Sequence, residues 1–415
     1  MKSKVPFSKG DHPLQRHLSV IAVVLVLTFL LASLALIFTS LHPGKNANAG
    51  SQFGVYVGSG DGAVFKLDAA NGQQLWRYKT KGRSIPAPVT DSNGMIYFGG
   101  LDGIVYALST ADGKLNWSFQ TQGPVLSSPT VANGLLYVGS SDGNLYALDA
   151  QKGTLIWHYH AGPATVAVDV HTVVASNDVI YGSSNDNVEF SYLFALDAKS
   201  GKQLWSVQVK DQNFTAPQVN SGIIYIASWA LEHQGGPDIK DSYVYAYNTN
   251  NGSLIWRSDK VGDFILAAPT TGNGIIYIGS QDTFVYALDA KTGHRVWRHN
   301  VGGIIYTPLS LVNGVVYAGV LPSVKGDATS RTNDATQSDG SIVALNATNG
   351  SLIWQHTIAN YTGTSLVVFN QFIYVGSAKD DLIHALRTTD ASGIWSQQDN
   401  VPAGVYTNAP ITAGP

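Results

Sequence analysis

The sequence predicts an all-β fold, an eight-bladed β-propeller of four-stranded antiparallel blades, and two observations lead to this fold class. An eleven-residue phrase that ends in tryptophan recurs eight times, and its clearest copy runs from Ala287 to Trp297. The copies follow one another at intervals of about 40 residues, a period typical of radial or stacked repeats. Each repeat is too small to bury its own apolar face, so it must pack against its neighbours. No segment after residue 50 shows the helical period that alternating strands and helices would need.

The repeat at residues 268–298 shows how the four strands of a blade are assigned. It opens with a short extended run, and an Asn-Gly pair then makes a turn that accepts positive φ angles. Residues 275–279 and 284–288 are β-branched and aromatic, which favours the second and third strands. A tight loop, residues 289–293, ends in a glycine that can take the left-handed conformation and leads into the fourth strand.

The last copy of the phrase departs from this pattern. In the other copies the loop glycine lies four residues before the tryptophan, as Gly293 does before Trp297. In the eighth copy Gly393 lies only two residues before Trp395. We therefore expect a shortened loop in the last blade.

The two ends of the repeat region predict how the ring closes. Residues 53–58 read as a second strand, and nothing in residues 42–52 resembles the first strand of that blade. The missing strand is supplied by residues 407–412, which match the opening run of another blade at residues 85–90. We expect the C-terminal strand to complete blade one, which hides strand edges that would otherwise pair with other chains.

The phrase Ala-x-Asp-x-x-Thr-Gly-x-x-x-Trp resembles the tryptophan-docking motif of pyrroloquinoline quinone (PQQ) repeat propellers. The copy that begins at Ala287 fits at every position, the copy that begins at Ala195 has Ser200 in place of threonine, and the resemblance covers roughly residues 53–415. It implies that the motif tryptophans pack between neighbouring blades as structural residues. These are Trp76, Trp117, Trp157, Trp205, Trp256, Trp297, Trp354 and Trp395. The family contains quinone-dependent dehydrogenases and also non-enzymatic propellers, such as the lipoprotein subunit of the outer-membrane protein assembly machine, so the fold does not fix the function.

The N-terminal region predicts a membrane anchor ahead of the propeller. Residues 18–41 contain no charge and are long enough to span a bilayer as one helix. The tail at residues 1–17 is basic, which predicts that the N-terminus lies in the cytoplasm. The protein would then cross the cell membrane once. Residues 42–52 would be a linker, and the propeller at residues 53–415 would lie on the extracytoplasmic side. The alternative is a signal peptide cleaved after Ala49, which would give a secreted propeller.

Composition excludes several classes of protein. The chain has 25 basic and 28 acidic residues and no basic stripe with interleaved aromatic residues, which disfavours nucleic-acid binding. It has no cysteine, so it forms no disulfide and carries no lipid on an N-terminal cysteine. It also lacks the adjacent cysteine pair that the resemblance would imply for a quinone alcohol dehydrogenase.

Three blades are longer than the repeat, and each insertion falls between the second and third strands, a connection that we call the middle hairpin. The insertions are at residues 184–191 in blade four, 229–242 in blade five and 320–340 in blade seven. Middle hairpins share one face of the disc with the connections between blades, and enlarged loops on one face are where binding usually resides. The candidate binding residues are Glu189, Trp229, the one tryptophan outside the repeat, and Glu232. The alternative is that these loops are tolerated surface insertions, since loop entropy grows slowly with length.

The first strand of blade four has polar residues where other blades have apolar ones. Asp169 and His171 alternate on one side of this inner strand, which predicts that they face the central channel and bind a cation or transfer a proton. The alternative is a water-filled channel that needs no apolar lining. His158 and His160 also alternate on an outer strand, but no third metal ligand is evident.

These observations favour a membrane-anchored extracytoplasmic propeller that binds another envelope protein or a small ligand as a scaffold, with no cofactor and no catalytic residue. One alternative, implied by the resemblance, is a PQQ-dependent oxidoreductase of the alcohol or sugar dehydrogenase type with a bound calcium ion. A second alternative is a sensor domain for a small ligand. No nucleophile elbow, Walker loop or metalloprotease motif is present in the sequence.

Overall fold

The structure is a computed structural model of the whole chain. It describes residues 53–59, 61–82, 89–90, 93–162, 169–186, 190–210, 212–230, 241–322, 339–359, 361, 365–377, 382–398 and 411–414. The expected tail, anchor and linker at residues 1–17, 18–41 and 42–52 lie outside these ranges. Among the described residues, no helix has the length and hydropathy needed to cross a bilayer.

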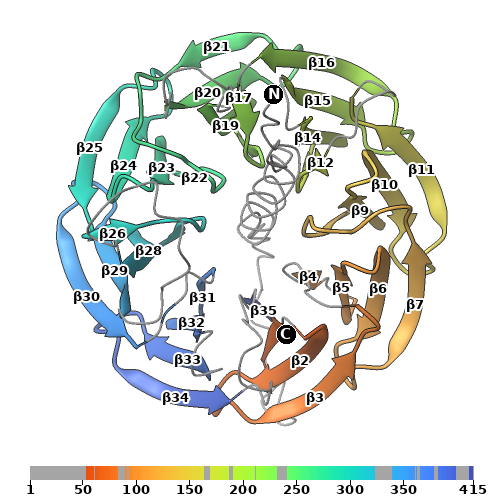
Figure 1. Cartoon of the computed structure of the whole chain (residues 1–415), viewed down its shortest axis with the longest axis horizontal. Coiled ribbons are helices and arrows are strands. Elements are labelled where there is room, and N and C mark those ends of the chain that lie inside the picture. Colours follow the sequence, from red (N-terminus) through yellow and green to blue (C-terminus); the bar gives the residue numbers. More distant parts are fainter. Residues whose placement is uncertain are drawn as a thin grey trace, which may run out of the picture.

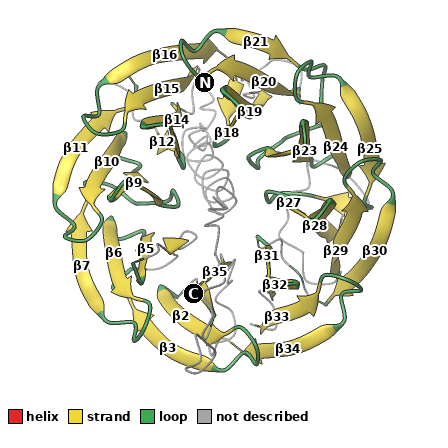
Figure 2. Ribbon diagram, turned by 180° about the vertical axis from the view of Figure 1, so that it is seen from behind, coloured by secondary structure: helices red, strands yellow, loops and turns green. Residues whose placement is uncertain are grey.

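The described strands form eight sheets arranged around a central axis, which confirms the predicted eight-bladed propeller (Figure 1). Seen from behind, strands joined by loops make up all the described structure (Figure 2). Every pair of hydrogen-bonded strands within a blade is antiparallel, as in the pairing of Tyr277 with Ala287. The fourth strands run along the rim, and the first strands lie nearest the axis.

Five blades have the predicted four strands. Blade one has β1 (Gly54–Gly58), β2 (Ala63–Asp68), β3 (Gln74–Lys79) and β35 (Ile411–Gly414), and blade two has β4 (Val89–Thr90), β5 (Met95–Gly99), β6 (Ile104–Ser109) and β7 (Leu115–Gln120). Blade three has β8 (Thr130–Ala132), β9 (Leu135–Gly139), β10 (Asn144–Asp149) and β11 (Leu155–His160). Blade six has β22 (Thr270–Gly272), β23 (Ile275–Gly279), β24 (Phe284–Asp289) and β25 (Arg295–Asn300), and blade eight has β31 (Val367–Phe369), β32 (Phe372–Ser377), β33 (Leu382–Arg387) and β34 (Gly393–Gln398).

The other three blades have five strands because their innermost strand is split in two. Blade four has β12 (Asp169–Val170), β13 (Val174–Ser176), β14 (Val179–Asn185), β15 (Phe190–Asp197) and β16 (Gln203–Lys210). Blade five has β17 (Gln212–Phe214), β18 (Gln218–Asn220), β19 (Ile223–Ala230), β20 (Ser242–Asn248) and β21 (Leu254–Arg257). Blade seven has β26 (Gly303–Ile304), β27 (Ser310–Val312), β28 (Val315–Pro322), β29 (Gly340–Asn346) and β30 (Leu352–Ile358).

These are the three blades with insertions, so the expectation of four strands in every blade is wrong for them. Part of each insertion lengthens the two strands of the middle hairpin, and the lengthened second strand offers new backbone partners to the residues that precede the inner strand. Asp169 thus pairs with Asn185 in blade four, and Gln212 pairs with Ala230 in blade five. The insertions therefore extend these three sheets further than the others on one face of the disc.

The ring closes in blade one through the C-terminal strand, as the sequence predicts. β35 pairs with β1 in a register that runs from Gly54 opposite Gly414 to Val57 opposite Ile411. The described strand begins at Ile411, later than the expected start at residue 407, and residues 407–410 lie outside the described ranges. The first and last described strands are thereby joined in one sheet.

Each motif tryptophan reaches into the next blade, where its indole N–H donates to a main-chain carbonyl oxygen. The donor–acceptor pairs are Trp76–Thr110, Trp117–Ala150, Trp157–Ala198, Trp205–Thr249, Trp256–Ala290, Trp297–Ala347, Trp354–Thr388 and Trp395–Ala69, at 2.9–3.3 Å. In five interfaces a tyrosine hydroxyl of the second strand donates to the same oxygen, namely Tyr97, Tyr137, Tyr225, Tyr277 and Tyr374. The indole thus fills an apolar interface while its one polar atom is satisfied.

The loop glycine is needed because the tight loop lies directly against the indole of the preceding blade. Gly293 has a φ of 74°, and a Cβ atom placed on it would lie 2.5 Å from Cε3 of Trp256. In blade eight Ala391 holds this place with a φ of 57°. Its N–H donates to Arg387 O at 3.0 Å, as that of Gly293 donates to Asp289 O at 2.8 Å. The eighth loop is therefore of normal length, and the expected shortening is wrong because Ala391, not Gly393, replaces the glycine.

Exchange of residues at these two equivalent positions tests this packing. Gly293→Ala should lower the free energy of unfolding by about 2–4 kcal/mol, because it adds both left-handed strain and overpacking against Trp256. Ala391→Gly should change it by less than about 1 kcal/mol, because relief of strain is offset by a more flexible unfolded chain. Urea unfolding followed by tryptophan fluorescence measures both, and a Gly293→Ala variant as stable as the natural chain would contradict this account.

Candidate functional site

The candidate site is the face that carries the extended middle hairpins of blades four, five and seven. In blade four the described part of the hairpin runs to the buried Asp186, just after β14, and resumes at Phe190, whose N–H donates to Asp186 Oδ1 at 2.8 Å. Of the residues expected to bind, Asp169 is in β12, His171 follows it, and Trp229 is in β19. Glu189 and Glu232 lie outside the described ranges. The structure therefore places the polar pair and the tryptophan on adjacent blades of the same face.

Trp229 is a buried strand residue and not an exposed loop residue. Its side chain is 6 % exposed, and its backbone pairs with Asn213 on one side and Ser242 on the other. Its role as a binding residue stays a prediction. Its neighbour Asn213 is also buried, and Oδ1 of Asn213 has no hydrogen-bond donor within the described part of the chain.

His171 is also buried and does not face a water-filled channel, which corrects that part of the expectation. It is 6 % exposed, and its main-chain N–H donates to Ser183 O at 3.0 Å. Burial lowers the pKa of His171 to about 4, so the ring is neutral at neutral pH. Asp169 remains partly exposed at the end of the inner strand.

Asn185 fixes the tautomer of His171. The main-chain N–H of Phe214 donates at 3.0 Å to one atom of the Asn185 amide, which must therefore be Oδ1. Nδ2 of Asn185 then faces Nε2 of His171 at 2.7 Å and donates to it. The neutral ring accordingly carries its proton on Nδ1.

These contacts belong to a buried polar network that joins blade four to blade five. Ser191 Oγ lies 2.6 Å from Asn185 Oδ1, and Asn185 Nδ2 also lies 3.1 Å from Phe214 O. Ser183 Oγ donates to Thr215 O at 2.7 Å. Because satisfied buried polar groups demand specific geometry, this network fixes how the extended hairpin of blade four sits on blade five.

Carboxylates in the middle hairpins of regular blades have a structural role. Tyr106 and Tyr146 donate their hydroxyls to Asp102 and Asp142, each at 2.7 Å. Blade one has Phe65 at the tyrosine position. The acidic residue of its hairpin, Asp61, lacks that donor.

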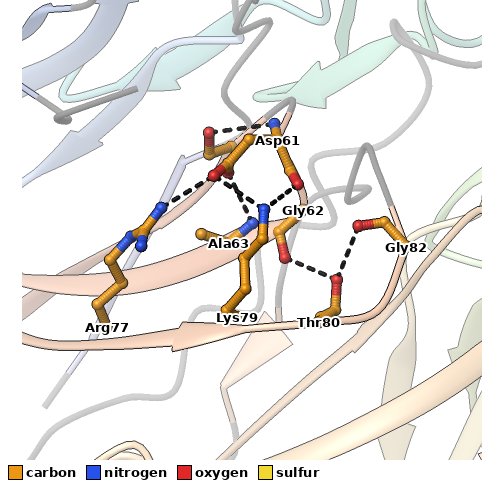
Figure 3. A network of polar contacts seen from close by, with 8 residues as sticks. Asp61, Gly62, Ala63, Arg77, Lys79, Thr80 and Gly82 are labelled. Carbon is orange, nitrogen blue, oxygen red and sulfur yellow. Dashed lines mark hydrogen bonds and ion pairs between the residues drawn. The ribbon is translucent and has the colours of Figure 1, made fainter. Parts of the chain in front are cut away.

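Asp61 is held instead by two cations of the rim strand (Figure 3). Its Oδ2 accepts from Arg77 and from Lys79, each at 2.9 Å, while its Oδ1 accepts from the N–H of Ala63. Burial raises the pKa of Asp61, but the hydrogen bond from Lys79 and those from Ser59 and Ala63 outweigh it, so the pKa is lowered. These contacts fix the conformation of the middle hairpin of blade one and occupy both oxygens of the Asp61 carboxylate.

The described residues do not form a metal site. No group of three or more histidine and carboxylate side chains within these ranges is placed to bind an ion. His158 is exposed and stacks on the Tyr146 ring at 6.1 Å, without a third ligand beside it and His160. The described residues therefore do not supply the cluster of oxygen ligands that a calcium ion needs.

Sequence reasoning missed the polar network, although one signal for it exists. Ser183, Ser184 and Asn185 follow the apolar start of β14, where regular blades have a glycine and a turn. In blade four this polar run continues the second strand two residues past the place at which the second strand of a regular blade ends. The identity of the partner, the main chain of Phe214, could not be read from the sequence.

The burial of His171 generates a prediction about pH. The folded protein keeps the ring neutral down to about pH 4, whereas the unfolded chain binds a proton below its usual pKa of 6.5. The natural chain should therefore lose up to roughly 3 kcal/mol of stability from this group as pH falls from 6.5 to 4. Urea unfolding should show that His171→Gln loses less stability than the natural chain between pH 6.5 and 4. The control His158→Gln, at an exposed position, should lose as much stability as the natural chain. Equal losses in all three proteins would contradict the assignment.

Comparison with known proteins supports the fold and identifies the family. The family model described as outer membrane protein assembly factor BamB matches residues 60–191, 240–337 and 338–413. The protein of that name from Moranella endobia (strain PCIT) is 30 % identical over 218 residues, which cover 51 % of this chain and 50 % of the relative. The chain thus matches only about half the length of that relative.

Two solved structures share the fold at low sequence identity. BamB from Moraxella catarrhalis has a TM-score of 0.57 and 17 % identity, covering 82 % of this chain and 92 % of that chain. The quinohemoprotein alcohol dehydrogenase ADHIIG from Pseudomonas putida HK5 has a TM-score of 0.61 and 16 % identity, covering 82 % and 68 %. At these identities the likeness concerns the fold alone. Because the family model matches well over half of the sequence, the chain belongs to the family of PQQ-repeat β-propellers described as outer membrane protein assembly factor BamB.

Proposed function

We propose that this chain is a non-enzymatic scaffold that binds another envelope protein through its middle-hairpin face. The observation that carries the proposal is the placement of all three extended hairpins on that face, on a propeller of the BamB family. A rigid disc with enlarged loops on one face provides a binding surface without any catalytic group.

The structure of blades four and five supports the use of this face for recognition. The network around Asn185 fixes the extended hairpin of blade four against the inner strand β17 of blade five, so the hairpin is held in one position before a partner binds. On this proposal Asp169 and His171 support the surface from below.

Membrane attachment is the second part of the proposal. The uncharged run at residues 18–41 would span the bilayer once, and the linker at 42–52 would carry the propeller on the extracytoplasmic side. β1 is the second strand of blade one, so it runs toward the middle hairpin of that blade. Its first residue, Gly54, therefore lies on the opposite face of the disc. The anchor would therefore leave the binding face directed away from the membrane.

One alternative is a dehydrogenase that uses quinone and calcium, which the structural likeness to the quinohemoprotein alcohol dehydrogenase favours. A second alternative is a sensor domain that binds a small ligand. Titration of the full chain with quinone and calcium, followed by thermal unfolding, separates these from the scaffold. A ligand at 100 times its Kd stabilises a protein by about 2.7 kcal/mol. A large rise in melting temperature, together with dye-coupled alcohol oxidation, would favour the enzyme, and we expect neither.

Site-specific crosslinking tests the scaffold directly. The natural chain has no cysteine, so a single cysteine gives one reactive position. A photo-crosslinker on Asp339→Cys, at the base of the blade-seven hairpin, should capture one discrete envelope protein in cells. The matched control is Lys152→Cys in a tight loop on the opposite face, which should capture none. Capture of the same protein from both positions, or from Lys152→Cys alone, would refute the proposed face.

A further inference from the structure

A packing pattern repeats between the rim strand of one blade and the third strand of the next. Two residues after the motif tryptophan, an aromatic side chain packs on the residue that precedes the motif alanine in the next blade. Three interfaces show this contact, with ring centroids 6.1 Å apart for Tyr78–Tyr106, 5.7 Å for Phe119–Tyr146 and 5.2 Å for Tyr159–Phe194. These aromatic pairs fill the outer part of the interface.

The other five interfaces have no tyrosine or phenylalanine at this place, which Val207, Ser258, His299, His356 and Gln397 hold. The interface between blades five and six has the smallest of these residues. The residue two places after Trp256 is Ser258, which faces a normal partner position at Tyr286. Ser258 Oγ accepts from Val244 N at 3.0 Å and donates to Asp259 O at 2.7 Å. This short side chain therefore completes the hydrogen bonds of its own blade and cannot fill the interface.

A cavity of about 270 Å³ lies where the aromatic side chain is missing. Val261, Tyr286 and Leu288 form part of its lining, and three charged residues also line it, Asp259, Lys260 and Arg295. β21, which ends at Arg257, is two residues shorter than β25 in blade six, so the rim strand does not cover the opening. The volume lies below the roughly 300–1,000 Å³ of sites for small molecules and cofactors.

The charges at the cavity are not equivalent. Lys260 Nζ lies 2.8 Å from Asp241 and 3.7 Å from Asp263, so its charge is neutralised within the protein. Arg295 is exposed and makes no ion pair with the described residues. Its guanidinium is suited to a carboxylate brought by a partner, since arginine binds carboxylates in a bidentate manner. Val296, the next residue on β25, is 50 % exposed.

We propose that this cavity receives an aromatic side chain of a partner protein, with an acidic residue beside it that pairs with Arg295. The occupant follows from the three sister interfaces, in which the same place holds an aromatic ring of the protein itself. The inference rests on the proposed scaffold role and adds to it a second contact, on the rim between blades five and six. Recognition of a buried aromatic anchor is a common source of binding energy at protein interfaces.

The probe is the peptide acetyl-Asp-(4-fluoro-Phe)-Asp-amide, titrated into the full chain in detergent and followed by fluorine NMR. We expect a saturable shift with the natural chain. Ser258→Phe fills the cavity from within and should weaken binding by roughly tenfold or more, because the buried ring is excluded. The melting temperature of this variant shows whether it folds.

A second variant keeps the test valid if Ser258→Phe is unstable. Arg295→Gln removes an exposed charge and should weaken binding by several-fold, with a weaker dependence on salt. The matched control is Arg257→Gln on the neighbouring rim strand, whose guanidinium lies over the Tyr243 ring at 4.6 Å and does not line the cavity. It should bind the probe like the natural chain.

Several results would overturn the inference. These are no binding to the natural chain, equal binding to folded Ser258→Phe, or equal binding of a peptide with alanine in place of the aromatic residue. Free phenylacetate that binds as tightly as the peptide would reassign the cavity to a small ligand. Failure of the peptide while the crosslinker at residue 339 still captures its partner would defeat this inference alone. Loss of that capture would defeat the scaffold proposal, whatever the peptide does.

Discussion

A hydrogen bond from an indole N–H to a main-chain carbonyl of the next blade is the interaction on which the rest of this ring depends. Each tryptophan buries a large apolar surface between two sheets, while the bond fixes its orientation. Ala290 O, for example, accepts from Trp256 at 3.3 Å and from Tyr225 at 3.1 Å. The same contact recurs where Trp395 reaches Ala69 across the join of the ring. Together with the pairing of β1 and β35, it leaves no gap between the last blade and the first.

The sequence predicts the parts of this structure that are local and repeated. The spacing of the tryptophans gives the number of blades, and the opening run near the C-terminus gives the closing strand. The errors concern features that depend on contacts between blades. His171 and Trp229 are polar or amphipathic residues next to insertions, and only the lengthened strands of blades four and five bury them. Ala391 was missed for a related reason, because its equivalence to glycine is defined by its backbone conformation and not by its residue type.

Regular and irregular blades differ in the surfaces that they present. Blades two, three and six keep the repeat, and their hairpin carboxylates are occupied by tyrosine hydroxyls, as in Asp142 and Tyr146. Departures from the repeat give surfaces that differ from blade to blade: the extended hairpins, the polar network at Asn185 and the cavity beside Ser258. A uniform ring cannot distinguish one partner position from another. On the proposed scaffold function, specific recognition would reside where the repeat is broken, and the proposed contacts all lie there.

The most direct test of the central claim compares the tryptophan that closes the ring with one inside it. Trp395 and Trp205 are both partly buried and donate to carbonyl oxygens at 3.1 Å and 2.9 Å, but their acceptors are 326 and 44 residues away in the chain. If the ring is closed by equivalent contacts, Trp395→Phe and Trp205→Phe should each lower the free energy of unfolding by about 2–3 kcal/mol in a single cooperative transition. A Trp395→Phe variant that unfolds like the natural chain, beside a destabilised Trp205→Phe variant, would show that the ring is not closed in this way.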